Sequence, residues 1–210
     1  MSKGAAAPTV RVAHPEFRPH VTHLRPEADL EAAEEAAADL LAALGLDLAD
    51  ESLVDTPRRM ARALIEMTTS SGFELTTFPN DEGYDELVLV RDIPVQSLCE
   101  HHMLPFVGVA HVGYLPGGRI LGLSKFARMV DLHARQPQTQ ERLTKRIADH
   151  LERSLQPKGV GVVIEAEHTC MSLRGARAVG TRTVTSTLFG QLRDDPRSRA
   201  EFLALTRSKP

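Results

Sequence analysis

The sequence predicts an α+β fold in which helices pack on one face of an antiparallel sheet. Helical and strand-like segments follow one another in the order helix, helix, strand, strand, helix, helix, strand, strand, helix, if the two arms of the hairpin at 106–123 are taken as one strand segment. The short turn Pro116-Gly117-Gly118 separates a run with alternating β-branched residues at 106–115 from a returning apolar run at 119–123, which is typical of an antiparallel hairpin. Strands joined in this way, with helices grouped before and after them, indicate the α+β class.

Composition limits the classes of function. A chain of 210 residues suits one domain with an appended segment, and 42% hydrophobic residues can supply its core. Aromatic residues make up only 4%, with no tryptophan, and the net charge is -3, so a nucleic-acid-binding surface is not expected. No apolar run is typical of a signal peptide or long enough to span a bilayer. We therefore expect a cytoplasmic protein that binds neither nucleic acid nor a membrane.

The chain divides into three predicted segments: a disordered N-terminal tail at 1–27, a helical segment at 28–72 and the main domain at 73–210. The tail is rich in Pro, His and Ala without periodicity. In the second segment, a leucine and alanine stripe predicts a helix that Gly45 ends. A second helix is expected to begin at Asp55, as the capping residue, with Pro57 in its first turn.

The main domain opens with a predicted loop at 72–85. β-Branched and apolar runs then predict strands at 86–93, 106–115, 119–123, 159–167 and 181–189. Apolar residues at helical spacing predict helices at 124–133 and 139–155, and Asp195-Pro196 is expected to begin a last helix that ends near Leu205. The third strand is expected to pair with the second across the 116–118 turn.

Cys99, His102 and Cys170 form a candidate metal site. Cys99 and His102 have the Cys-x-x-His spacing of a chelate, and Cys170 follows a predicted strand. Two thiolates and one imidazole suit Zn²⁺, and three protein ligands leave a fourth position for water, as in catalytic zinc sites. His101 and His168 flank these ligands and are candidates for proton transfer.

The same residues allow two alternatives to a metal site. The cysteines could be small buried hydrophobic residues beside surface histidines, because free cysteine is often buried. They could also form a Cys99–Cys170 disulfide, but nothing else in the sequence suggests an oxidising compartment. The close association of both cysteines with histidines favours the metal.

Two helix starts carry candidate substrate-binding groups. Ser124, Lys125 and Arg128 open the 124–133 helix and could hold phosphate, although a solvated basic face has the same pattern. Arg174 could reach the same anion. Glu141 opens the next helix, where it could accept hydrogen bonds from guanine or simply interact with the helix dipole.

The chain resembles GTP cyclohydrolase I from about Asp55 to Leu205. Five motifs carry the resemblance in order: Cys99-Glu100-His101-His102-Met103-Leu104-Pro105-Phe106, Gly122-Leu123-Ser124-Lys125, Gln140-Glu141-Arg142-Leu143-Thr144, His168-Thr169-Cys170-Met171-Ser172 and Arg174-Gly175. The resemblance implies the tunnelling fold (T-fold), in which sheets of several subunits join into an oligomeric barrel. It also implies a homodecamer with active sites at subunit interfaces.

The resemblance also implies an activity. This is the zinc-dependent opening of the imidazole ring of GTP, with release of formate and rearrangement to 7,8-dihydroneopterin triphosphate. At the matching positions it implies these roles: zinc ligands Cys99, His102 and Cys170; proton transfer by His101 and His168; guanine binding by Glu141 and Gln140; and triphosphate binding by Ser124, Lys125, Arg128, Arg174 and Arg59. Arg59 would come from a neighbouring subunit.

The sequence departs from the family pattern near the guanine anchor. Gln136 and Pro137 replace an arginine and the residue after it, and His133 stands where an aromatic is common. Ser52 replaces a glycine before the Thr-Pro-x-Arg motif. These changes affect the expected catalytic efficiency more than the type of reaction.

Two other functions are alternatives. One is a zinc-containing, weakly catalytic nucleotide-binding protein, and the other is a nitrile-reducing relative with a nucleophilic cysteine. The pathway served, whether folate, pterin or deazapurine, stays open.

Overall fold

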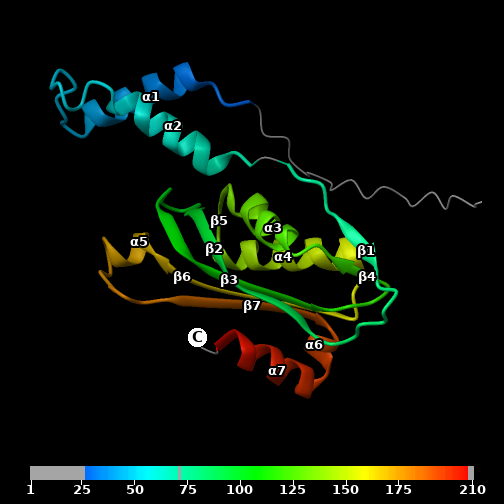
Figure 1. Cartoon of the computed structure of the whole chain (residues 1–210). Coiled ribbons are helices and arrows are strands. Elements are labelled where there is room, and N and C mark those ends of the chain that lie inside the picture. Colours follow the sequence, from blue (N-terminus) through cyan, green and yellow to red (C-terminus); the bar gives the residue numbers. More distant parts are fainter. Residues whose placement is uncertain (1–26, 71, 208–210) are drawn as a thin grey trace, which may run out of the picture.

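The computed structural model describes residues 27–70 and 72–207, so almost all of the predicted disordered tail lies outside the described residues. Helices α1 (Leu30–Ala43) and α2 (Thr56–Thr68) pack against each other as a hairpin beside the rest of the fold (Figure 1). The side chain of Asp29 caps α1 by accepting from Ala32 N at 3.0 Å, and Gly45 ends the helix with a φ of +85°. Asp55 does not cap α2 as expected. Its carboxylate instead accepts a hydrogen bond from the Arg59 guanidinium at 2.9 Å.

A curved five-stranded sheet forms the centre of the main domain, with the strand order β5-β2-β3-β6-β7. Four of its strands are antiparallel: β2 (Val88–Cys99), β3 (Pro105–Leu115), β6 (Gly159–His168) and β7 (Thr183–Gly190). The short β5 (Pro137–Gln138) pairs in parallel with the end of β2. The predicted α+β class is therefore confirmed.

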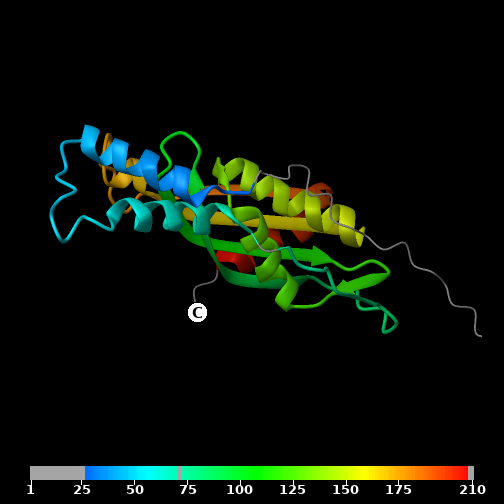
Figure 2. The same ribbon diagram turned by 90° about the horizontal axis from the view of Figure 1, so that it is seen from above.

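The main core lies between the sheet and two helices, α3 (Ser124–Ala134) and α4 (Gln140–Leu155) (Figures 1 and 2). α4 is amphipathic, and its apolar stripe includes the fully buried Leu143, Ile147 and Leu151. Thr139 caps it by accepting from Arg142 N at 3.2 Å. Burial of the stripe against β6 and β7 fixes the first turn of α4, which carries Gln140 and Glu141, at the edge of the sheet.

The expectation that all helices cover one face is wrong for the C-terminal segment. Helices α6 (Gln191–Asp194) and α7 (Pro196–Arg207) lie on the opposite face of the sheet (Figure 1). Val112 belongs to the main core, whereas the next residue, Gly113, faces the ring of Phe202 from α7. Because adjacent residues of a strand point to opposite faces, α7 covers a second, smaller core.

Two predicted strand assignments also differ from the structure. β4 (Arg119–Leu121) does not pair with β3 as expected. It pairs with β1 (Thr77–Pro79), which lies in the segment 72–85 that was expected to be a loop. The Tyr114 hydroxyl accepts from Leu121 N at 2.9 Å and holds this small sheet against the end of β3. β2 continues past Pro94 to Cys99, because proline is tolerated where a strand has a partner on one side only.

None of the helices in the described residues is long and apolar enough to cross a membrane.

Candidate metal centre and catalytic site

The loop between β2 and β3 brings Cys99 and His102 together. Cys99 ends β2, and its backbone N–H donates to Leu104 O at 2.8 Å, while Met103 N donates back to Cys99 O at 2.9 Å. Met103 closes the turn with a left-handed φ of 53°. This turn places Nδ1 of His102 3.9 Å from the Sγ of Cys99.

Cys170 reaches the same point from the other side of β3. β6 pairs with β3 so that His168 lies opposite Phe106, and the single turn of helix α5 (Thr169–Ser172) follows directly. The Thr169 hydroxyl donates to Pro105 O at 2.6 Å and ties α5 to the start of β3. Cys170 thereby comes beside the loop that carries the other two candidate ligands.

The three candidate ligand atoms fit one metal ion. The Sγ atoms of Cys99 and Cys170 and a ring nitrogen of His102 all lie within 4.8 Å of one another. Ligands of a tetrahedral zinc ion, at about 2.0–2.3 Å from the metal, lie at most about 4 Å apart, so only small adjustments are needed. Both cysteines are free thiols in the structure, so Cys99 and Cys170 do not form the disulfide considered as an alternative. Burial and the neighbouring Cys99 raise the pKa of the Cys170 thiol, an effect that a bound divalent cation would oppose.

The two candidate proton-transfer residues flank this cluster. His101 is exposed, with its Nδ1 3.8 Å from Cys99 Sγ and its Nε2 3.9 Å from a Glu100 carboxylate oxygen. His168 is half-buried and stacks on Phe106 with a ring separation of 4.7 Å. Burial lowers the pKa of His168, and the negative charge of Glu141 partly opposes this shift. The structure therefore places His101 beside the candidate ligand Cys99, His168 beside the chain segment that carries Cys170, and Glu141 near His168.

An unexpected contact joins the Cys99–Phe106 motif to the Gln140–Thr144 motif. Arg142, next to Glu141, forms a two-pronged ion pair with Glu100 of the metal loop. Glu100 N also donates to Gln138 O at 3.3 Å. These contacts join the start of α4 to the ligand loop. The only signal in the sequence is that each charged residue is adjacent to a candidate site residue.

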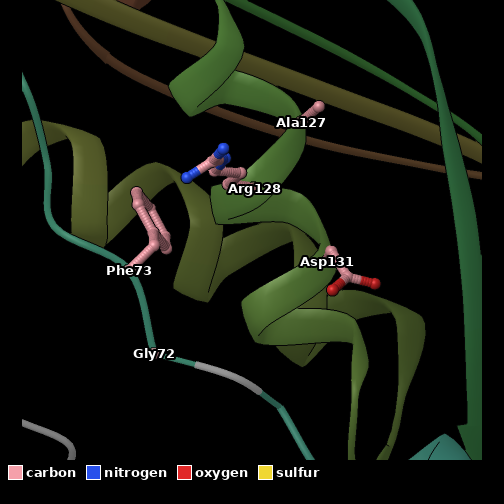
Figure 3. A pocket seen from close by; sticks show the side chains of 5 residues that line it. All are labelled: Gly72, Phe73, Ala127, Arg128 and Asp131. Atoms are coloured by element: carbon pink, nitrogen blue, oxygen red, sulfur yellow. The ribbon is translucent and has the colours of Figure 1, made fainter.

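The candidate phosphate-binding residues on α3 lie farther away. The Ser97 hydroxyl donates to Ala134 O at 2.7 Å, which places the end of α3 beside the end of β2. Ser124 and Lys125 begin the same helix, 11 residues long, so they lie about 15 Å from that point. Lys125 Nζ is 5.8 Å from the centre of the Phe73 ring. Arg128 is exposed in a shallow cleft of about 360 Å³ that Phe73 and Asp131 also line (Figure 3).

The remaining two candidate residues, Arg174 and Arg59, are both exposed. Arg174 follows α5 and is close enough for its charge to affect the pKa of Cys170. Arg59 lies on α2, where it pairs with Asp55 among three arginines of one helix face. Within the described residues, no hydrogen bond or ion pair joins Arg59 to the metal ligands. A single chain therefore assembles the candidate metal ligands with His101, His168, Gln140 and Glu141, but leaves Ser124, Lys125 and Arg59 apart from them.

Comparisons with known proteins agree with this geometry. Residues 33–207 match the family model described as GTP cyclohydrolase I. A protein named GTP cyclohydrolase 1 from Mycolicibacterium gilvum is 53% identical over 185 residues, covering 86% of this chain and 92% of its own. Proteins of the same name from Streptomyces avermitilis and Thermoanaerobacter pseudethanolicus are 52% and 51% identical, covering 85% and 86% of this chain and 91% and 98% of their own. This chain belongs to the GTP cyclohydrolase I family.

Proposed function

We propose that this protein is a zinc-dependent GTP cyclohydrolase that opens the imidazole ring of GTP, releases formate and forms 7,8-dihydroneopterin triphosphate. The convergence of Cys99, His102 and Cys170 within 4.8 Å, in a chain of this family, carries the proposal. A zinc ion at this site would lower the pKa of a bound water to about 7 and so supply hydroxide at neutral pH. Since thiolate ligands must stay reduced, we infer that the protein works in the cytoplasm.

The residues around the metal ligands suit the proton transfers and the recognition of guanine. His101 and His168 lie on two sides of the cluster and can exchange protons with the purine ring and with its formyl product. Glu141 presents a carboxylate at the first turn of α4, where two acceptor oxygens match the N1–H and 2-amino group of guanine. His101 lies just after the end of strand β2, His168 ends strand β6, and Glu141 lies at the start of helix α4, so packing of the core holds all three in place.

We further propose that the triphosphate is held across a subunit interface. Ser124, Lys125 and Arg128 of one chain and Arg59 of another would join Arg174 around the phosphates, because one chain leaves these groups apart. Cationic side chains and helix N–H groups bind phosphate well. The triphosphate is not consumed, so these contacts position GTP rather than react with it. The expected assembly is a homodecamer.

Incubation with GTP, followed by oxidation and detection of neopterin fluorescence, tests the activity directly. The purified protein should contain about one zinc per chain, and Cys99→Ser and Cys170→Ser should lose zinc and activity together. Ser97→Ala is a matched control, because it removes a nearby hydroxyl that is not a candidate ligand. Full activity of metal-free protein would contradict the proposal. GTP binding without product would support the alternative of a weakly catalytic binding protein.

A further inference from the structure

The side-chain amide of Gln140 is buried in a hydrogen-bond network next to His168. Only 1% of the residue is exposed. Its Nε2 donates to Ile164 O at 3.0 Å, to Thr183 O at 3.0 Å and to Thr185 Oγ1 at 3.1 Å, so two N–H groups serve three acceptors. Its Oε1 lies 2.8 Å from His168 Nε2. The amide is thus engaged by protein groups at both of its ends.

The orientation of the amide is fixed by groups that can only accept. Ile164 O and Thr183 O are backbone carbonyls, so the amide nitrogen must face them. In a flipped amide, Oε1 of Gln140 would face these two carbonyl oxygens, and no hydrogen bond could form. The Thr144 hydroxyl donates to Gln140 O at 2.8 Å. Because the only hydrogen of the Thr144 hydroxyl is used there, the Thr185 hydroxyl must donate in the 2.6 Å contact between the two hydroxyls. The oxygen of Thr185 is then free to accept from Gln140 Nε2.

This network determines which nitrogen of His168 carries the proton. Because Oε1 of Gln140 can only accept, the partner at 2.8 Å must be an Nε2–H of His168. Neutral His168 is then the Nε2–H tautomer, and Nδ1 has the free lone pair. Stacking on Phe106 holds the plane of the ring. Among the described residues, Nδ1 has no hydrogen-bond partner, so it is left for the substrate.

We propose that Gln140 is a positioning residue that locks His168 in its Nε2–H tautomer, so that protons pass to and from the substrate only at Nδ1. His168 gains a proton at Nδ1 and returns it to the substrate there, while Nε2–H stays bonded to Gln140 in both states. The inference rests on the proposed function. It assigns to Gln140 a role other than the guanine contact expected from the family resemblance, because its amide is already engaged.

Kinetics distinguish the two roles of Gln140. Gln140→Met keeps the length of the side chain but neither donates nor accepts, and it should lower kcat about 10–100-fold, the scale of impaired acid–base catalysis. KM for GTP should stay within about twofold of the wild-type value, since no substrate contact is lost. Zinc content should be unchanged. A raised KM at normal kcat would instead show a guanine contact and overturn the proposal.

Thr185 offers a matched pair of variants one step farther from the substrate. Thr185→Val removes the hydroxyl but leaves Ile164 O and Thr183 O to orient the amide, so it should lower kcat less than Gln140→Met does, with KM and zinc content unchanged. Thr185→Ser keeps the hydroxyl and should recover most of the lost kcat. Equal effects of valine and serine would show that packing, and not the network, is responsible.

The tautomer itself can be observed without substrate. Solid-state nitrogen spectra of the zinc-loaded protein with ¹⁵N-histidine should show His168 with protonated Nε2 and unprotonated Nδ1, assigned by the signals that His168→Asn removes. Gln140→Met should give a mixture of tautomers. A wild-type Nδ1–H tautomer, or an unchanged pure tautomer in Gln140→Met, would overturn the lock. If GTP is not turned over, the activity proposal fails while these spectra still decide the tautomer.

Discussion

At the residue scale, a buried histidine pair joins α3 to α4. His133 Nε2 lies 2.8 Å from His150 Nδ1, and the Phe73 ring stacks against His150 at 6.3 Å. Burial, followed by repulsion from His150, Arg146 and Arg153, lowers the pKa of His133 to about 3. Burial and Arg153 also lower the pKa of His150. Both rings are therefore neutral in the folded protein at neutral pH.

This pair predicts an acid-sensitive fold. In the unfolded chain each histidine has a pKa of about 6.5, so below this pH the unfolded state binds more protons than the folded state. The contribution of the neutral pair to the free energy of unfolding is fully present above about pH 6.5. It is lost as the pH falls towards 3, by up to about 1.4 kcal/mol per pH unit for His133. The apparent melting temperature should drop between pH 7.5 and pH 5.5, and this drop should be smaller in His133→Phe than in the wild type. Equal falls in both proteins would refute the assignment.

Glu141 gives a second prediction at this scale. Glu141→Gln places an amide donor where guanine offers only donors, and kcat/KM for GTP should fall on the order of 10²-fold or more. Zinc content should remain normal, because Glu141 is not among the candidate ligands. ATP should be a poor substrate of the wild type, since it lacks the N1–H and 2-amino donors. Comparable turnover of ATP and GTP would contradict this role.

The sequence could predict the candidate ligands but not their supporting contacts. Cys99 and His102 are three residues apart, and Cys170 follows a strand, so local spacing is enough to mark them. The network around Gln140 depends on Thr183 and Thr185, more than 40 residues later in the chain. Only the pairing of β6 with β7 and the docking of α4 bring these groups together.

At the scale of elements, the packing of α7 against the sheet gives a sharp stability prediction. A Cβ added at Gly161 would lie 2.6–2.9 Å from atoms of the Phe202 ring, which is fully buried. Gly161→Ala should therefore lower the free energy of unfolding by about 1–3 kcal/mol, as overpacking usually does. Gly118→Ala is the matched control, because nothing lies within 4 Å of its added Cβ.

Denaturant unfolding measures both glycine variants. A smaller side chain should relieve the clash, so Phe202→Leu should cost less in the Gly161→Ala background than in the wild type. Additive effects of the two substitutions would show that Gly161 and Phe202 do not contact each other. Equal stability of Gly161→Ala and Gly118→Ala would show the same.

Elements with strong periodicity were predictable, whereas their partners were not. The stripe that includes Leu143, Ile147 and Leu151 correctly predicted α4. The pairing of β4 with β1 was missed because three-residue strands carry too little pattern to indicate a partner. The position of α7 was missed because the Gly113 and Gly161 surface that receives Phe202 has no apolar signal in the sequence.

At the scale of the whole molecule, the single chain leaves open strand edges. Among the described residues, β2 has a partner on its outer edge only at Leu98 and Cys99, and β7 pairs only with β6. Exposed edges of this length favour pairing with another chain. Exposed apolar side chains follow helix α5, which carries the candidate ligand Cys170, with Leu173 at 75% and Val179 at 81%. Both features support closure of the sheet and of the active site by neighbouring subunits, and light scattering should show a large homo-oligomer.

The same reasoning predicts complementation between inactive variants. Arg59→Ala and Cys99→Ser should each be inactive alone. If each site takes Arg59 from a neighbour, randomly mixed oligomers should have about a quarter of their sites intact and should recover activity in that proportion. If Arg59 acts within its own chain, no mixed site has both wild-type residues. Co-expression with two affinity tags, followed by tandem purification, isolates the mixed oligomers for assay.

A matched control separates complementation from other effects of mixing. Cys99 and Cys170 come from one chain, so oligomers of Cys99→Ser with Cys170→Ser contain no complete ligand set and should stay inactive. Activity in this control would mean that the metal site, and not only the phosphate clamp, is shared between chains. No activity in either mixture would refute a role of Arg59 across the interface. Recovery only with Arg59→Ala would place Arg59 and the metal ligands of one active site on different subunits.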